Sequence, residues 1–419
     1  MNDLDLLRRY EPILRFTKGE AFFPVRVDGY VRACDLWLRE PNGAAKLLVP
    51  AGRLDLEMLA HYDEQRPGYQ PYLRFVQEPL EGLEYQRWLL RKDRSAFSTS
   101  GRLARVGLGA RLIDAAFSLS LLLRGTVPGG TTAAAEQKYR AMLLPEPRYT
   151  YYGRVLRQSG YIILHYLFFY VMNDWRSSFY GANDHEADWE QLFIYLEDCD
   201  GEPGRPVWLA YAAHDESGDD LRRRWDDPAL AHVGDHPVVY VGAGSHACYF
   251  LPGEYLTRVE IGFLQPLFTA AHVLERIWRN TLQQGDPQKL AQRLEGALSI
   301  PFVDYARGDG PVIGPGGDQP WDPVLITPDM SWLEQYRGLW GLETGDPFSG
   351  EKAPAGPKYT RSGTIRETWY NPLGWSGLAK VAPPTTAPAL LEQHIAALND
   401  EVDAVRRQVD VLREALPRL

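Results

Sequence analysis

The chain has 419 residues, of which 45% are hydrophobic, and its formal net charge is −10. This length suits one large domain with insertions or two ordinary domains, and the apolar fraction is enough for a substantial core. An acidic chain is a poor default binder of nucleic acid, because phosphate contact requires a concentrated basic face. We therefore expect no nucleic-acid partner, and a local basic patch is the alternative.

The N-terminal residues 1–9 contain no basic stretch followed by an apolar one. We therefore expect no signal peptide and a cytoplasmic location. The three cysteines, Cys34, Cys199 and Cys248, show neither metal-binding spacing nor a disulfide framework. Buried free thiols are the expected state of these cysteines.

Residues 10–90 are predicted to form short strands and loops, with strands at 13–16 and 22–27. Residues 101–143 are rich in Ala and Leu and indicate a helical insertion. The most apolar run in it, 115–123, is about half of the ~20 residues that cross a bilayer. This run is interpreted either as a helix buried against the core or as a helix lying at a membrane interface.

The strongest strand signals lie between residues 149 and 250. Residues 161–171 are nearly all apolar or aromatic, which is typical of a strand buried on both faces. Residues 188–196 alternate, with Trp189, Phe193 and Tyr195 on one face. Further strands are expected at 206–213 and 237–242. Because aromatic and β-branched residues favour pleated surfaces, the fold class is predicted to be mainly β, a β-sandwich with helical insertions.

The rest of the chain completes a predicted domain organisation. A second helical insertion is expected at about 263–298, and residues 301–380 are predicted to be loops and short strands. The β-sandwich domain would thus cover 1–380, followed by a Pro-rich linker at 381–389 and a coiled-coil helix at 390–417.

That last segment has apolar residues at alternating spacings of four and three, which is a heptad seam. They are Leu391, Ile395, Leu398, Val402, Val405, Val409, Leu412 and Leu416. With Ile395, Val402 and Val409 at a positions, this pattern favours a parallel two-stranded coiled coil, and we expect self-association. The alternative is one amphipathic helix folded back on its own domain.

The segment His185-Glu186-Ala187-Asp188-Trp189-Glu190 carries the clearest chemistry. In a strand Asp188 and Glu190 project together, and their face continues as an apolar surface. Two carboxylates placed there would repel each other and lose hydration, so a divalent cation would stabilise both. His185 has the opposite parity and can join them only if it lies in an irregular turn that enters the strand, which Asn183-Asp184 makes plausible.

A fourth ligand could come from Asp174, and Asp184 is the local competitor. A ligand set of carboxylates and one imidazole suits Mg²⁺, Ca²⁺ or Mn²⁺ better than a structural Zn²⁺ site. The alternative is a surface of ion pairs without metal.

A second group of residues follows a predicted strand at Gly242-Ala243-Gly244-Ser245-His246. A Ser–His nucleophile pair is conceivable, but side chains of adjacent residues rarely point at each other. We therefore expect Ser245 and His246 to support or bind a ligand, together with His214, which ends another strand.

These residues resemble a known family. The block Asn183-Asp184-His185-Glu186-Ala187-Asp188-Trp189-Glu190 and the block Gly244-Ser245-His246-Ala247 look like the vacuolar protein sorting-associated protein sixty-two family. The resemblance covers roughly residues 10–90 and 150–375, and this family implies no defined activity.

The spacing of His185, Asp188 and Glu190 is also similar to the H-x-x-D-x-E pattern of necrosis- and ethylene-inducing-like toxins. That resemblance implies a divalent cation on a β-sandwich, with Asp174 as the upstream Asp, and recognition of lipid sugar headgroups.

Three functions follow as hypotheses. The first is a metal-binding protein that recognises a polar headgroup or glycan, at a membrane surface if the ligand is a lipid. The second is a hydrolase in which the metal activates water and His246 or His214 is the base. The third is a scaffold with a structural ion.

Overall fold

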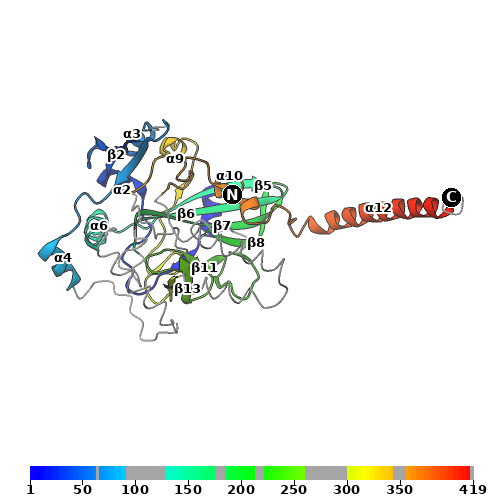
Figure 1. Ribbon diagram of the computed structural model, residues 1–419. Coiled ribbons are helices and arrows are strands. Elements are labelled where there is room, and N and C mark those ends of the chain that lie inside the picture. The colour runs from blue at the N-terminus through cyan, green and yellow to red at the C-terminus, as the bar shows by residue number, and fades with distance from the viewer. Residues whose placement is uncertain are drawn as a thin grey trace, which may run out of the picture.

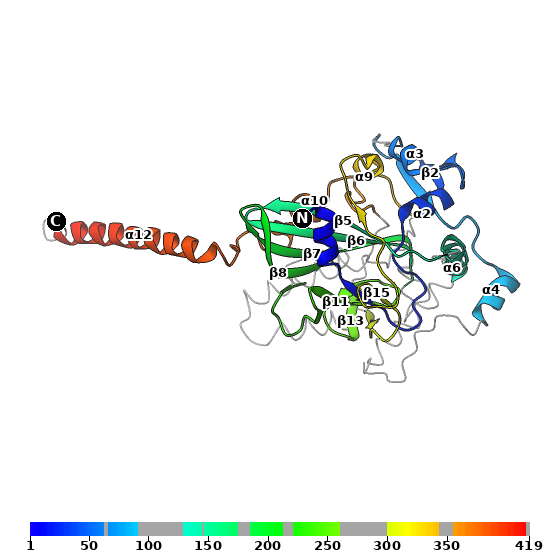
Figure 2. The ribbon, with the colours of Figure 1, turned by 180° about the vertical axis from the view of Figure 1, so that it is seen from behind.

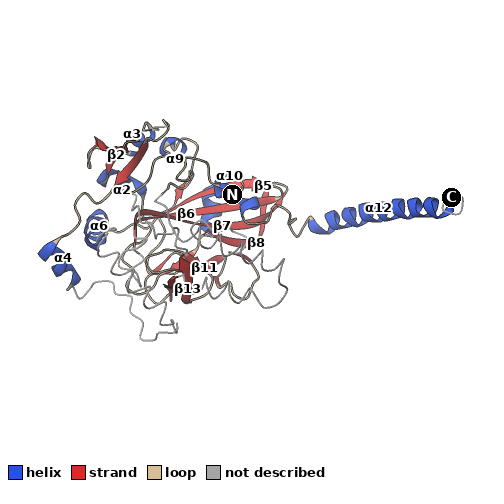
Figure 3. Cartoon of the chain, viewed as in Figure 1, coloured by secondary structure: helices blue, strands red, loops and turns tan. Residues whose placement is uncertain are grey.

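The computed structural model describes residues 1–62, 66–90, 129–144, 146–174, 185–212, 221–259, 300–342 and 355–415. About 33% of these residues lie in strands and 26% in helices, and they form several sheets with helices between them (Figures 1 and 3). The prediction of a mainly β protein therefore holds in part, and the two-sheet sandwich stays a prediction.

A six-stranded sheet occupies the centre of the body, in the order β16-β5-β6-β7-β8-β9. Its long strands follow one another as antiparallel hairpins, and β6 is buried along its whole length, as predicted for the run at 161–171. The strands are β16 (Val324–Leu325), β5 (Tyr151–Gln158), β6 (Tyr161–Asn173), β7 (His185–Cys199), β8 (Glu202–Ala212) and β9 (Arg222–Arg224).

One face of this sheet packs against a five-stranded sheet and helix α1 (Asp3–Arg9) through a single apolar cluster. The cluster joins Tyr166, Leu192 and Leu209 of the central sheet to Val239 and Ile313 of the second sheet. The second sheet consists of β10 (His232–Val233), β11 (His236–Val241), β1 (Ile13–Arg15), β15 (Val312–Ile313) and β12 (Cys248–Tyr249), and β1 pairs parallel to β11.

Helices and a small sheet cover the opposite face. Around Phe169 and Trp340 they form the largest apolar cluster of the described residues, in which Tyr30 packs edge to face on Phe169 and Trp189 does so on Trp340. The elements here are α2 (Val27–Ala33), β2 (Asp35–Arg39), β3 (Ala45–Val49), α3 (Leu56–Ala60), β4 (Gln70–Arg74), α6 (Gly129–Met142), α9 (Ser331–Gln335), α10 (Glu367–Tyr370) and α11 (Pro372–Trp375).

The remaining elements lie around this body. Helix α4 (Gly82–Leu89) packs beside α6, and strands β13 (Gly253–Val259) and β14 (Ile300–Ala306) form a two-stranded sheet. Helix α12 (Ala387–Ala415) projects from the body, and Figure 2 shows the same projection from behind. Among the described residues, no helix has the length and apolarity needed to span a bilayer.

Two predictions about local structure need correction. The strand expected at 22–27 does not form: residues 21–26 are irregular, and Val27 begins α2. Tertiary contacts decide this, because the Val27 backbone N donates to the Tyr152 hydroxyl. The terminal helix begins at Ala387, earlier than predicted. Of the two expected insertions, only α6 in the first lies within the described residues, and 263–298 falls outside them.

Candidate functional site

Two carboxylates of β7 are buried at the end of the β6–β7 hairpin. Asp188 pairs in register with Tyr170, and Glu190 pairs with Phe168. Tyr170 and Phe168 belong to the cluster between the two sheets, as does Leu192, which follows Glu190 by two residues. Asp188 and Glu190 therefore sit at the polar end of an otherwise apolar face.

An irregular residue separates this pair from the start of the strand. Ala187 is buried and adopts φ 57°, a left-handed conformation that a residue with a Cβ rarely adopts. On either side of it the side chains point to opposite faces, because Glu186 contacts Phe75 in the helical layer, whereas Asp188 contacts His246. Alternation then returns His185 to the face of Asp188. The irregular residue thus lies within β7, after His185, and not in a turn before the strand as predicted.

His185 has a defined ring orientation. Its Nδ1 lies 2.9 Å from the Ala187 carbonyl oxygen, which can only accept, so Nδ1 carries the proton. Metal-ligating histidines commonly make this backbone bond through one nitrogen and bind the metal through the other. His185 is thus held in the tautomer that a ligand at Nε2 needs.

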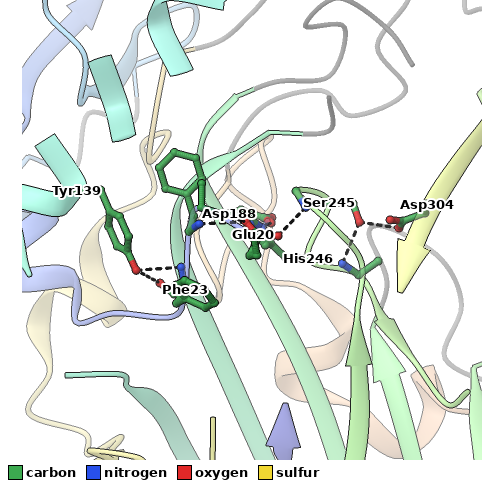
Figure 4. A network of polar contacts seen from close by, with 11 residues as sticks. Glu20, Phe23, Tyr139, Asp188, Ser245, His246 and Asp304 are labelled. Carbon is green, nitrogen blue, oxygen red and sulfur yellow. Dashed lines mark hydrogen bonds and ion pairs between the residues drawn. The ribbon is translucent and has the colours of Figure 1, made fainter. Parts of the chain in front are cut away.

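His246 lies at the centre of the carboxylates (Figure 4). Its Nδ1 donates to Asp188 Oδ2 at 2.8 Å, and its Nε2 lies 3.7 Å from Glu20 Oε1. Its ring stacks on Tyr170 with centroids 3.8 Å apart. Burial lowers the pKa of His246, but the hydrogen bond to Asp188 and the charge of Glu20 outweigh burial and raise that pKa to about 9. His246 is therefore an imidazolium at neutral pH.

Glu20 also fixes the turn that carries His246. Its Oε2 accepts from the Gly244 backbone N at 2.9 Å, and its Oε1 accepts from the backbone N of Phe22 at 3.0 Å. Burial alone would raise the pKa of Glu20, but His246 and these backbone donors lower it. His246 itself adopts φ 58°, so a second left-handed residue with a Cβ occurs at this site.

Asp174 reaches the same turn through its backbone. It follows β6 directly, is buried, and its backbone N donates to the Gly244 carbonyl at 2.8 Å. Its neighbour Asn173 pairs in register with His185. Both polar atoms of the buried Asn173 amide lack a hydrogen-bond partner within the described part of the chain, which is unusual for a buried amide.

Ser245 and His246 point to different partners. The Ser245 hydroxyl donates to Asp304 Oδ2 at 2.6 Å, and the Tyr249 hydroxyl donates to the same oxygen at 2.8 Å. Ser245 therefore has no His-activated nucleophile geometry. In the metal-free site, burial is outweighed by the hydrogen bond to Asp188 and the charge of Glu20, which raise the pKa of His246 to about 9 and favour its protonated form.

The structure brings together part of the predicted site. Asp174, Asp188 and His246 meet around the turn at 242–247, and His185 lies next to them on β7. Within the described ranges, however, no group of three or more His, Cys, Asp or Glu side chains is arranged to hold a metal ion. Asp184 and His214 lie outside the described residues.

Three residues of this site were not predicted from the sequence: Glu20, Tyr170 and Asp304. Glu20 is 226 residues before His246 and lies in no recognisable motif. Tyr170 looked like one more core aromatic, and Asp304 is an isolated acid on β14. Long-range contacts place all three, so no local pattern in one sequence could have indicated them.

No protein-family model matches the sequence, and neither does any curated protein. The resemblance to the vacuolar sorting family therefore gains no support from these comparisons.

Solved structures of necrosis- and ethylene-inducing proteins do match. Necrosis and ethylene inducing protein 2 from the causal agent of cocoa's witches' broom disease is 19% identical over 24% of this chain and 44% of its own, with a TM-score of 0.20. NLPPya in complex with glucosamine is 17% identical over 25% of this chain and 44% of its own, with a TM-score of 0.19. A mutant of NLPPya is 12% identical over 54% of this chain and 67% of its own, with a TM-score of 0.24.

The chain thus spans less than half of the length of the first two of these structures. Because the TM-scores are this low, the likeness carries no argument about function, which has to rest on the site itself.

Proposed function

We propose that the chain binds a divalent cation at Asp174, His185, Asp188 and Glu190, and that this site recognises a polar headgroup or a glycan. The donor set fits a hard cation, since it offers carboxylate oxygens and one imidazole whose proton is held on Nδ1. When bound, the cation would supply a charge that orients hydroxyl or phosphate oxygens of the ligand.

One observation carries this proposal. The Asn173 amide is buried without a hydrogen-bond partner among the described residues, beside Asp174 and opposite His185. A buried amide without hydrogen bonds costs roughly 1–3 kcal/mol of stability. We therefore infer that a bound group satisfies the Asn173 amide beside these buried acids. A cation or its water would satisfy Oδ1, and a water or a ligand hydroxyl would accept from Nδ2.

In the metal-free protein, His246 takes the place of the cation as the positive charge at this site. Without a cation, the imidazolium balances the charges of Asp188 and Glu20. A bound cation would share Asp188 with His246, which would then orient this carboxylate as a supporting group rather than as a base.

Ligand binding tests the proposal. Saturation-transfer NMR with glucosamine, and sedimentation with phosphatidylcholine vesicles with and without a glycosylated lipid, would be run with Ca²⁺ or Mg²⁺ and again with chelator. We expect binding to at least one probe that requires the cation and is lost in Asp188→Asn. The matched control is Asp226→Asn, which changes an exposed carboxylate far from the site. Binding that chelator and Asp188→Asn leave unchanged would overturn the proposal.

A further inference from the structure

Helix α12 exposes an apolar stripe along its length. The helix spans 29 residues, about 43 Å at 1.5 Å per residue. Six apolar side chains of one stripe are between 40% and 60% exposed, which is unusual for so many large apolar residues at heptad spacing. They are Leu391, Ile395, Leu398, Val402, Val405 and Val409.

The described residues of the body do not cover this stripe. Both views show α12 leaving the body as a separate projection (Figures 1 and 2). The segment before it is anchored instead: the Val381 carbonyl accepts from the Tyr161 hydroxyl, and the Thr385 backbone N donates to Glu197 Oε1 at 2.9 Å. Since the helix begins at Ala387, only two residues after this anchor, it has little freedom to fold back.

The seam itself fits a second copy of the same helix. Its a positions are Ile395, Val402 and Val409. Leu occupies three of its four d positions, which are Leu391, Leu398, Val405 and Leu412. β-Branched residues at a with Leu at d pack best in parallel two-stranded coils.

Charged residues beside the seam fit the same partner. In a parallel pair, Glu401 at g faces Arg406 at the next e position of the other chain, and symmetry makes this contact twice. Within one chain Arg406 pairs with Asp403 at 3.5 Å, and both side chains are largely exposed. Arg406 is therefore available to a partner at little cost.

We propose that α12 forms a parallel two-stranded coiled coil with a second copy of this chain. The anchor and the candidate site lie at opposite ends of the β6–β7 hairpin, since Tyr161 pairs with Glu197 and Asn173 pairs with His185. That separation is about 40 Å along β6. The coil therefore carries two bodies whose sites face away from the stalk, and, if the proposed function holds, this arrangement adds avidity on a surface with many ligands.

The mass of the full-length protein tests the pairing without any ligand. Sedimentation equilibrium over a concentration series should give twice the chain mass of 47.5 kDa. Leu398→Glu with Val402→Glu places charge in the seam and should return the monomer mass. The matched control, Ala397→Glu with Ala404→Glu, adds the same charge away from the seam and should stay dimeric. A monomeric wild type, a trimer or an equal loss in the control would overturn the proposal.

Cross-linking tests the orientation. In a Cys199→Ser background, which leaves only the buried Cys34 and Cys248, Leu391→Cys should form a disulfide-linked dimer on mild oxidation. Gln393→Cys, two residues away on the outer face, should not. In an antiparallel pair the two Leu391 positions lie at opposite ends of the coil. If the Leu391→Cys variant has the mass of a dimer but forms no disulfide, the parallel arrangement is wrong.

Discussion

Two buried carboxylates on β7, Glu186 and Asp188, are two residues apart, but their side chains lie on opposite faces of the sheet and have different hydrogen-bond partners. Glu186 faces the helical layer and accepts from the backbone N atoms of Phe75, Val76 and Leu342 at 2.9, 2.7 and 3.0 Å. Asp188 faces the second sheet, where a protonated side chain, His246, is its partner. The left-handed Ala187 between them sends the two side chains to opposite faces.

The difference separates a structural acid from a candidate functional one. Burial raises the pKa of Glu186, and the hydrogen bonds from three backbone N atoms offset part of that rise. These donors belong to the backbone and are fixed by the fold. Such an acid joins the end of β4, β7 and the chain near residue 342. Asp188 is instead held by the His246 side chain, which can lose its proton or move. Asp188 can therefore exchange this partner for a cation.

Removing Glu186 should have the largest effect on stability. Glu186→Ala leaves three buried backbone N–H groups without acceptors, and we expect the free energy of unfolding to fall by about 3–5 kcal/mol. Urea denaturation measures this change. The control is Glu202→Ala, which changes an exposed residue at the start of β8. If the loss stayed within the error of the control, the structural assignment of Glu186 would be wrong.

The cluster around Asp188 should instead make stability depend on pH. The folded pKa of His246 is raised to about 9, above its ordinary value of about 6.5. Its contribution is thus fully present below pH ~6.5 and is lost as pH rises through 9. The shift corresponds to at most about 3 kcal/mol.

Urea denaturation in chelator, from pH 6 to pH 10, measures this loss in the metal-free protein. His246→Asn should flatten the profile, because Asn tolerates the left-handed backbone but carries no charge. A wild-type profile as flat as that of the variant would show that His246 is not the counter-charge of Asp188 and Glu20.

How far the sequence predicts this arrangement depends on the range of the interactions. Residues 161–171 are predicted as a buried strand because the continuous apolar run lies within the segment itself. The sequence predicts that His185 lies in an irregular turn before the strand, whereas His185 begins β7 and the irregular residue, Ala187, lies inside it. The helix at Val27 was missed, because a contact with Tyr152 sets it. Glu20 was missed for the same reason, since it meets His246 only in the folded chain.

The partner of Asp188 also changes an expectation. The sequence analysis predicts that Asp188 and Glu190 repel each other without a cation. If that repulsion dominated, Asp188→Asn would stabilise the metal-free protein. With His246 bound to Asp188 at 2.8 Å, the same replacement removes an ionic hydrogen bond instead. We therefore expect Asp188→Asn to destabilise the metal-free protein modestly, by about 1–3 kcal/mol.

Cation content tests the central claim most directly. Wild type, Asp188→Asn and the surface control Asp226→Asn would be dialysed against Ca²⁺, Mg²⁺ or Mn²⁺, and bound metal would be measured by mass spectrometry, alongside melting with and without chelator. We predict that wild type and the control retain one cation per chain and melt lower in chelator, whereas Asp188→Asn retains none and is unaffected. Equal metal in wild type and Asp188→Asn, with melting unchanged by chelator, would contradict the account and leave the cluster as a network of ion pairs.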